Sequence, residues 1–223
     1  WMFFLARTDP NVPKHKGISY VLANMKSPGI TVRPLVNMAD MHAFNEVYLD
    51  NVRMPKANLV GEKNQGWYVA MATLNFERSG VEWSAMARRS HEEIVAYARA
   101  TRHNGRPLAQ DPIVRGKLAE RAVEIQVSRQ LAYRIAWMQS QGLSPDAQAS
   151  MAKSFGTELL QRRSLPGRQI RGLRGLVGPG SPWAVLAGRL MRYYLRSFGL
   201  TIEAGTSEVQ RLLIATRGLG LPR

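Results

Sequence analysis

Glu77 is the acidic residue whose place in the sequence is best suited to chemistry. It lies between Phe76 and Arg78, three residues beyond Leu74, where apolar residues recur at three- and four-residue steps. Such spacing predicts a helix with Glu77 near its apolar face. A carboxylate beside aromatic and aliphatic groups has its charged form disfavoured, which suits it to act as a general base. The alternative is an ordinary helical glutamate that is solvated or paired with an arginine.

Residues for other common catalytic sites are absent or scattered. The chain has no cysteine, which excludes disulfides, thiolate zinc sites, iron–sulfur clusters and cysteine nucleophiles. Its four histidines form no His-x-x-x-His pair, so we expect no metal site. The glycine-rich run at 175–180 contains Pro179 and does not follow a strand, unlike a dinucleotide-binding loop. The nucleophile elbow of serine hydrolases is missing as well.

The chain is strongly basic, but its charge is unevenly placed. There are 31 Lys and Arg residues against 16 Asp and Glu, a formal net charge of +15, and residues 162–175 hold five arginines without an acid. A basic nucleic-acid-binding module is one alternative that such a balance suggests. Elsewhere basic residues are dispersed among acidic ones, so we do not expect nucleic acid as the partner. No apolar run reaches the ~18 residues of a membrane-spanning helix.

The first 62 residues have the pattern of a β region. Turn signals such as Ser27-Pro28-Gly29 separate short apolar runs. These runs lie at 1–6, 18–24, 30–36 and 43–49. They predict an antiparallel sheet or partial barrel, followed by an exit loop at 53–59 that carries Pro55. Because Trp1 opens directly on an apolar run, we expect a further part of the protein upstream.

From Gly66 onward the apolar spacing becomes helical. One stripe predicts a single helix of about 35 residues that stops near Asn104. Asp111 and Pro112 supply the cap and first turn of a second helix to about residue 141. Further helices are predicted from 144–146, around 185–198 and at about 206–216, with a break at 166–167. Long helices with short connections predict an antiparallel bundle. The fold class is therefore α+β, with the sheet first and the bundle second.

Six segments of the chain resemble the acyl-CoA dehydrogenases and follow the order in that family. They are Trp1-Met-Phe-Phe-Leu-Ala-Arg-Thr-Asp-Pro, Lys26-Ser-Pro-Gly-Ile, Asp50-Asn-Val-Arg-Met-Pro, Gly66-Trp-Tyr-Val-Ala-Met, Gly105-Arg-Pro-Leu and Ile202-Glu-Ala-Gly-Thr-Ser-Glu-Val-Gln-Arg211. The resemblance implies that residues 1–62 are the C-terminal half of a middle β domain. Residues 63–223 would be a C-terminal up-down four-helix bundle, and an N-terminal helical domain would precede residue 1.

Family members bind FAD and convert an acyl-CoA thioester to a trans-2-enoyl-CoA by removing an α-proton and a β-hydride. In the medium-chain type the base precedes the Gly-Thr of the C-terminal motif, where this chain has Ala204, and Glu203 stands one residue too early. In the isovaleryl-CoA and long-chain types it precedes an Arg on the first bundle helix, where this chain has Glu77 and Arg78. The resemblance thus implies Glu77 as catalytic base, Arg78 as a substrate-binding residue and a branched or bulky acyl group.

The resemblance also implies contacts with the thioester and the cofactor. The backbone N–H of Ala204 would bind the thioester carbonyl and stabilise the developing enolate. The usual Arg-x-x-Phe-Gly motif reads Thr101-Arg102-His103-Asn104-Gly105, so the displaced Arg102 is the expected FAD contact from that loop. Thr206 and Glu208 match positions near the FAD in the family, and Gly178 and Gly180 match the glycines that approach the adenosine pyrophosphate of a neighbouring subunit.

Residues 162–175 depart from the family, which has a continuous helix there. Pro166 removes a helical hydrogen bond at a cost of about 3 kcal/mol, and the nearby glycines weaken a helix further. A reading-frame difference in the source sequence and a genuine subfamily insertion both account for this segment.

Partners and location follow from the same resemblance. An electron-transfer flavoprotein would accept the electrons, and the protein would be a homo- or hetero-oligomer of lipid catabolism. The absence of cysteine is compatible with the cytoplasm. An alternative function stays open, namely a catalytically silent subunit of a heteromeric dehydrogenase in which Glu77 is merely structural.

Overall fold

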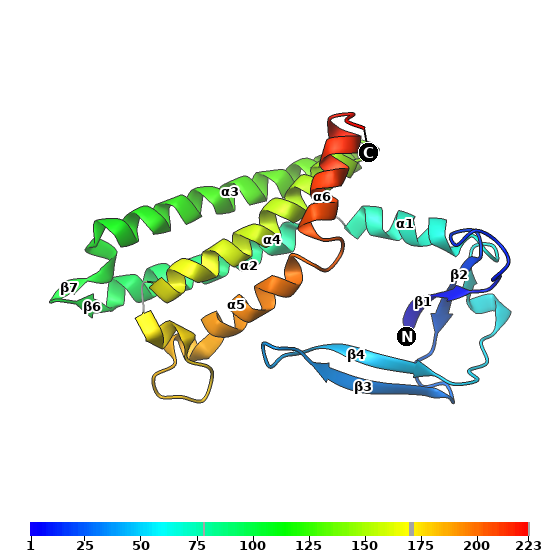
Figure 1. Cartoon of the computed structure of the whole chain (residues 1–223), viewed down its shortest axis with the longest axis horizontal. Coiled ribbons are helices and arrows are strands. Elements are labelled where there is room, and N and C mark those ends of the chain that lie inside the picture. Colours follow the sequence, from blue (N-terminus) through cyan, green and yellow to red (C-terminus); the bar gives the residue numbers. More distant parts are fainter. Residues whose placement is uncertain (78, 170–171, 223) are drawn as a thin grey trace. The chain divides into compact units, whose positions relative to one another are not determined.

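The computed structural model describes residues 1–77, 79–169 and 172–222, with side chains described except at 75–76, 163–169 and 172–173. The chain divides into two compact units, whose elements are labelled in Figure 1. The N-terminal unit comprises Trp1–Asn37 and His42–Glu77, and the helical unit comprises Met38–Met41 and Arg78–Arg223. The domain boundary between residues 62 and 63 stays a prediction.

A three-stranded antiparallel sheet lies in the N-terminal unit. Its strands, in the spatial order β1-β2-β5, are β1 Met2–Arg7, β2 Ile18–Ala23 and β5 Leu59–Val60. β1 and β2 pair from Met2 opposite Ala23 to Arg7 opposite Ile18. The two apolar runs predicted as strands at 1–6 and 18–24 are therefore confirmed.

The predicted exit loop at 53–59 is only partly a loop. After Pro55 the chain forms a 3-10 turn at Lys56–Asn58 and then joins the sheet as β5 beside β2. Asn58 fixes this course because its side-chain amide donates a hydrogen bond of 3.0 Å to the carbonyl of Leu22. A tertiary contact with β2 thus turns an apparent loop into an edge strand.

A separate hairpin holds the remaining strands of the unit. β3 Ile30–Val36 and β4 His42–Leu49 pair antiparallel, from Ile30 opposite Leu49 to Leu35 opposite Phe44. The register shifts at Val36, near the turn. Both predicted runs are strands, but they form their own two-stranded sheet and do not extend the first one.

Helix α1, Gly66–Glu77, packs on the first sheet. Its first residue must be glycine because a Cβ there would lie 2.2 Å from backbone atoms of Ser19 and Tyr20. The buried Ser19 hydroxyl also forms a hydrogen bond of 2.7 Å with Thr8 Oγ1 and accepts one of 2.8 Å from the backbone N–H of Asn64. These contacts fix where the chain leaves the sheet and enters the helix.

The predicted single helix of about 35 residues is wrong, because the structure has two helices there. α1 ends at Glu77, and α2, Val81–Ala100, begins after Gly80. Gly80 has φ 67°, a left-handed conformation through which a right-handed helix cannot continue. A Cβ at Gly80 would also lie 2.6 Å from the ring of Trp83. The continuous apolar stripe concealed this break.

The helical unit is an antiparallel bundle built around α4. Its further helices are α3 Pro112–Ser140, α4 Asp146–Gln169, α5 Arg189–Leu200 and α6 Ser207–Leu213. α4 packs against α2, α3, α5 and α6, and α2 also packs against α3 (Figure 1). Leu159 and Leu160 of α4 lie at the centre of the core with Ala87, Ile125 and Leu200 of the neighbouring helices. The predicted fold class, α+β with the sheet first and the bundle second, is confirmed.

Helix boundaries in the bundle agree with the sequence signals at most ends. The Asp111 carboxylate accepts from the amides of Ile113 and Val114 at 2.8 and 3.0 Å, so α3 begins where predicted. α5 begins at Arg189, later than predicted, because Leu186 and Ala187 have φ 50° and 53° in the preceding turn Val185–Gly188. α6 is capped by Thr206 and continues into a π turn at Ile214–Gly218.

The predicted break at residues 166–167 is wrong, since α4 runs to Gln169. Pro166 costs one intrahelical hydrogen bond close to the end of the helix, whereas the buried leucines earlier in α4 anchor it in the core. The explanations offered for residues 162–175 stay untested; residues 170–171 and the side chains of 163–169 and 172–173 lie outside what the structure describes.

Candidate active site

The turn between α5 and α6, residues 201–206, has a strained backbone. Ala204 has φ 54° and Gly205 has φ 90°, so two consecutive residues are left-handed. For a residue with a Cβ this conformation costs roughly 1–2 kcal/mol. The surrounding structure must therefore hold Ala204 in place.

Two buried side chains hold the turn through its carbonyl oxygens. The ammonium of Lys153, on α4, donates to the carbonyl of Gly205 at 2.7 Å. The side-chain amide of Gln210, on α6, donates to the carbonyls of Ala204 and Gly205 at 3.1 and 3.3 Å. Lys153 and Gln210 are 5% and 6% exposed. Both carbonyls are thus directed at the bundle interior.

The backbone N–H of Ala204 is left available by this arrangement. Among the described residues no acceptor is recorded for it, and Ala204 itself is exposed. An amide donor held rigidly by contacts on its neighbouring peptide groups is the kind of group that stabilises a developing oxyanion.

Glu203 is bound within the turn region. Its carboxylate accepts two hydrogen bonds from the guanidinium of Arg196, on α5, at 2.8 and 3.0 Å. Both bonds come from the same guanidinium nitrogen, Nη2, and because both groups are charged they are stronger than neutral hydrogen bonds. Glu203 is therefore part of the scaffold that joins the end of α5 to the turn.

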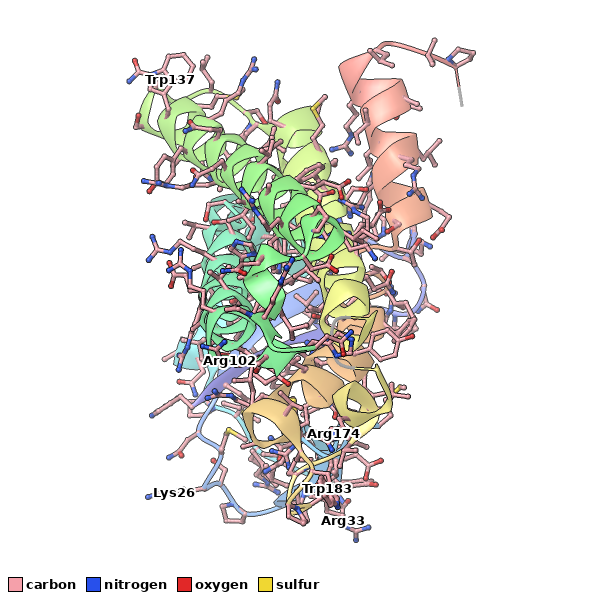
Figure 2. The ribbon with its side chains drawn as sticks, turned by 90° about the vertical axis from the view of Figure 1, so that its left-hand side faces the viewer. Lys26, Arg33, Arg102, Trp137, Arg174 and Trp183 are labelled. Carbon is pink, nitrogen blue, oxygen red and sulfur yellow. The ribbon has the colours of Figure 1, made fainter. Side chains whose placement is uncertain are left out.

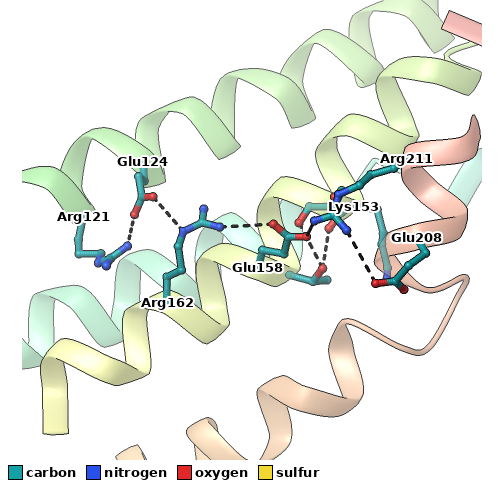
Figure 3. A network of polar contacts seen from close by, with 9 residues as sticks. Arg121, Glu124, Lys153, Glu158, Arg162, Glu208 and Arg211 are labelled. Carbon is teal, nitrogen blue, oxygen red and sulfur yellow. Dashed lines mark hydrogen bonds and ion pairs between the residues drawn. The ribbon is translucent and has the colours of Figure 1, made fainter. Parts of the chain in front are cut away.

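A chain of ion pairs runs from α3 across α4 to α6 (Figure 3). Glu124 contacts Arg121 and, at 3.1 Å, Arg162. Arg162 also lies 3.5 Å from Glu158, which in turn pairs with Arg211. Several of these residues border an open cleft of about 500 Å³, lined by Glu158, Gln161, Arg162, Thr201, Ile202, Thr206, Ser207, Glu208 and Arg211. The cleft places polar groups beside the strained turn.

Two groups at this end of the bundle have shifted pKa values. Burial lowers the pKa of Lys153, and the nearby Glu203, Glu158 and Glu208 act in the opposite direction. Glu208 is exposed, and hydrogen bonds from its own backbone N–H and from the Thr206 hydroxyl lower its pKa. Thr206 and Glu208 therefore form a polar cap at the start of α6, where Thr206 Oγ1 also accepts from the Val209 amide at 3.3 Å.

Glu77, the predicted catalytic base, can be placed by the structure within the N-terminal unit. Glu77 is the last residue of α1, and its side chain is exposed. It lies in the N-terminal unit, whereas Ala204 lies in the helical unit. The role of Glu77 stays a prediction. Arg78, predicted to bind substrate, lies outside the described residues.

Arg102 lies on a small hairpin that the sequence analysis missed. β6 Arg102–His103 pairs with β7 Arg106–Pro107, and Asn104 and Gly105 between them have φ 50° and 77°. The Asn-Gly dipeptide is the usual signal for such a turn. The Arg102 guanidinium, labelled in Figure 2, donates to the carbonyl of Gly105 at 2.9 Å. Its predicted contact with FAD stays a prediction.

Gly178 and Gly180 lie in the loop that precedes α5. Gly180 has φ 86° with open space where a Cβ would point, while a Cβ on Gly178 would meet Met191 Cε at 2.9 Å. The guanidinium of Arg174 lies 4.8 Å from the ring centre of Trp183 across this loop (Figure 2). The backbone at Gly180 is thus open to approach by a ligand.

Sequence reasoning missed the residues that hold the turn: Lys153, Gln210 and Arg196. The signal for Lys153 was present, because it falls between Ala149 and Thr157 at four-residue steps on the buried face of α4. A lysine in such a position is rarely buried without a specific partner. Its partner is a backbone carbonyl far along the chain, which the sequence does not reveal.

The described residues contain no group of three or more side chains placed to hold a metal ion. None of their helices is long and apolar enough to cross a membrane.

Comparisons with known proteins agree with the arrangement of the elements. Residues 64–219 match the family model "Acyl-CoA dehydrogenase, C-terminal domain". The chain is 32% identical over 225 residues to the acyl-CoA dehydrogenase IpdE1 of Mycobacterium tuberculosis, which covers 100% of this chain and 56% of that protein. It thus spans about half the length of this relative.

Two solved structures have the same fold over nearly the whole chain. The ChsE4-ChsE5 complex from Mycobacterium tuberculosis matches with a TM-score of 0.87 and 34% identity, over 99% of this chain and 57% of that one. The steroid ACAD Tcur3481-Tcur3483 matches with a TM-score of 0.86 and 33% identity, over 98% and 56%. Because the family model matches most of the chain and the fold agrees with these structures, the chain belongs to the acyl-CoA dehydrogenase family.

Proposed function

We propose that the protein containing this chain is an FAD-dependent acyl-CoA dehydrogenase that converts an acyl-CoA thioester to a trans-2-enoyl-CoA. The observation that carries this proposal is the strained turn at Ala204, whose carbonyls are held from the bundle side while its amide is available. That arrangement suits stabilisation of a thioester enolate. Family membership supports the reaction class.

Ala204 would act through its backbone alone. Its N–H would donate to the thioester carbonyl and stabilise the negative charge that develops there when the α-proton leaves. The fixed left-handed turn means that little reorganisation is needed at the moment of reaction. The methyl side chain cannot take a proton, so the base must come from elsewhere.

Glu77 would be that base. Its carboxylate would take the α-proton of the substrate, and Arg78 would contact the substrate beside it. The exposed side chain of Glu77, at the very end of a helix, is free to face a ligand. Glu203 is a poorer candidate because its oxygens are occupied by Arg196.

The residues at the start of α6 and in the glycine loop fit a flavin nucleotide. Ser207 Oγ is buried without a hydrogen-bond partner among the described residues, and Gly180 leaves space beside its backbone. Thr206, Glu208 and Arg102 would line this group, and Gly178 and Gly180 would approach the adenosine pyrophosphate of FAD in a neighbouring subunit. Bound FAD would supply the hydride acceptor, and an electron-transfer flavoprotein would reoxidise it.

A bulky or branched acyl group is the proposed substrate class. One matched structure is named a steroid ACAD. The name describes that protein, and the similarity to it supports a bulky substrate in our proposal. The proposed base, Glu77, lies on a helix, as the base does in the isovaleryl-CoA and long-chain types, and this also supports a branched or bulky substrate. We propose oligomeric assembly as well, because both matched structures are named as two-protein assemblies.

Those paired names also favour a second candidate function. In a heteromeric dehydrogenase one subunit can be catalytically silent, and Glu77 would then be structural. The two functions differ in whether this chain supplies the base.

A flavin absorbance experiment tests the proposal. The purified protein would be mixed anaerobically with branched, bulky and straight-chain acyl-CoA thioesters, alone and with any copurifying partner. In the parent protein we expect acyl-CoA to bleach the oxidised flavin spectrum. In Glu77→Gln we expect the oxidised spectrum to remain. A flavin that is bound but never reduced, or a reduction rate unchanged by Glu77→Gln, would overturn the proposed role of this chain.

A further inference from the structure

Lys153 is a buried lysine for which the proposed reaction has no direct use. It lies within α4, 5% exposed, and its ammonium reaches across to the turn before α6. The charges of three carboxylates, those of Glu158, Glu203 and Glu208, act on it and raise its pKa, against the effect of burial. No ion pair with Lys153 is recorded among the described residues. Its recorded hydrogen bond goes to the carbonyl of Gly205.

Arginines account for each neighbouring carboxylate. Glu203 is bound by Arg196, Glu158 by Arg162 and Arg211, and Glu208 lies 3.8 Å from Arg211. Each of these carboxylates would therefore keep an arginine partner if position 153 carried an apolar side chain. The function of the lysine must be sought in the carbonyl that it binds.

Burying an ammonium group is unfavourable unless it gains strong hydrogen bonds. A charge-assisted bond to a carbonyl is stronger than a neutral one and fixes the carbonyl direction. Here that carbonyl belongs to the residue after Ala204, whose left-handed conformation is itself unfavourable. Gln210 adds a second donor to Gly205 and one to Ala204. Two buried donors thus converge on one strained turn.

We propose that Lys153, assisted by Gln210, is a positioning residue that locks the Ala204–Gly205 turn so that the Ala204 N–H can bind the thioester oxygen. Lys153 itself touches neither substrate nor reacting atoms. With the two carbonyls held toward the bundle, the backbone at Ala204 cannot relax to a right-handed conformation that would redirect its amide. This inference rests on the proposed function and adds the residues on which that amide depends.

The test replaces Lys153 by methionine, which keeps the length of the side chain and removes the donor. The readout is the infrared stretching frequency of a ¹³C-labelled thioester carbonyl in enoyl-CoA bound to the FAD-loaded protein, because a hydrogen bond lowers that frequency. In Lys153→Met we expect the frequency to move toward its value in free enoyl-CoA. We also expect about 10- to 100-fold slower flavin reduction at saturating acyl-CoA, in line with a weakened oxyanion donor. The dissociation constant of acyl-CoA should change far less.

Two further variants keep the test decisive. Gln210→Leu should shift the carbonyl frequency in the same direction by a smaller amount, and it serves if Lys153→Met does not fold. Arg217→Met removes a positive charge and an ion pair to Asp146, also on α4, without touching the turn. It should leave both the frequency and the reduction rate at the parent values.

The possible failures are distinguishable. If the parent protein reduces its flavin but Lys153→Met and Gln210→Leu retain the parent carbonyl frequency and rate, the positioning role is wrong and the proposed function stands. A shift in Arg217→Met as large as in Lys153→Met would also overturn the positioning role, since it would show a general charge effect. If the parent protein binds FAD and acyl-CoA without reduction, the proposed function fails first.

Discussion

Glu77 and Glu203 are the two glutamates that compete for the role of base, and the structure treats them differently. Glu203 is half-buried, and both of its carboxylate oxygens accept hydrogen bonds from Arg196. Glu77 is exposed at the end of α1, and no hydrogen bond or ion pair is recorded for it among the described residues. A carboxylate that must accept a proton from a substrate has to be free to face it. A carboxylate that builds a turn has to be fixed.

The same contrast separates the segments that carry them. The turn at 201–206 is fixed by contacts from α4, α5 and α6, while the end of α1 is followed by a left-handed break at Gly80. The bundle thus rigidifies the segment that would act through its backbone. The segment that would act through a side chain is the last turn of α1, and among the described residues no hydrogen bond or ion pair is recorded for the side chain of Glu77.

Replacing Glu77 should have the largest effect on flavin reduction. Glu77→Gln removes the proposed base with little change in size, so flavin reduction by acyl-CoA should fall by several orders of magnitude. FAD content and acyl-CoA binding should remain close to the parent values. Stopped-flow absorbance with equilibrium titration measures both. Glu203→Gln is the matched control, and if it produced the larger loss the two roles would be exchanged.

Moving the carboxylate to the turn should restore part of that loss. Glu77→Gln with Ala204→Glu keeps the backbone N–H at 204 and adds a carboxylate where the medium-chain type has its base. We expect reduction to be about ten- to a hundredfold faster than in Glu77→Gln, within the range of general-base effects. Preference should move toward straight-chain acyl groups because the larger side chain narrows the pocket. A double variant as slow as Glu77→Gln would mean that position 204 does not face the α-carbon.

Breaking the ion pair between Arg196 and Glu203 should affect the free energy of unfolding more than the rate of flavin reduction. Arg196→Met leaves the partly buried carboxylate of Glu203 without its donors, which should lower the free energy of unfolding by about 1–3 kcal/mol. Glu203→Gln keeps an oxygen for Arg196 and should cost less than about 1 kcal/mol. Urea denaturation compares the three proteins, and equal losses from both substitutions would argue against the pair as a scaffold.

Relieving the strain at the turn should be mildly stabilising. Ala204→Gly removes the Cβ from a residue with φ 54°, so the free energy of unfolding should rise by about 0.5–1 kcal/mol after the entropy cost of glycine. The same denaturation experiment measures it. A loss of stability would show that the methyl group makes contacts that outweigh the strain.

The smallest effect on stability should come from replacing Glu208, an exposed residue in the first turn of α6. Its folded-state pKa is lowered below 4.5 by its own amide and the Thr206 hydroxyl, so its contribution to stability is present above 4.5 and is lost as pH falls through the lowered value. Glu208→Gln should therefore be slightly less stable than the parent near neutral pH, and this difference should vanish well below pH 4.5. A difference that grew on acidification would contradict the sign of this shift.

Local patterns in the sequence were sufficient for most elements. The runs at 18–24 and 30–36 became β2 and β3, and the cap at Asp111 with Pro112 placed the start of α3 correctly. Such signals act within one or two turns of chain, where propensity and capping bonds dominate. The family motif at 202–211 likewise identified the turn before α6 and the alanine in it.

Tertiary contacts decided what those patterns could not express. The stripe from Trp67 to Ala98 has helical spacing throughout, yet Gly80 breaks it, because spacing records which residues are apolar and not which backbone angles they adopt. β5 exists only because β2 offers an edge beside it. The sequence by itself determined the family, most of the strands and helix starts, and the candidate glutamates. Only the tertiary structure brought Lys153, Arg196 and Gln210 onto one strained turn, since their partners lie on other elements and a single chain pattern carries no record of such distant contacts.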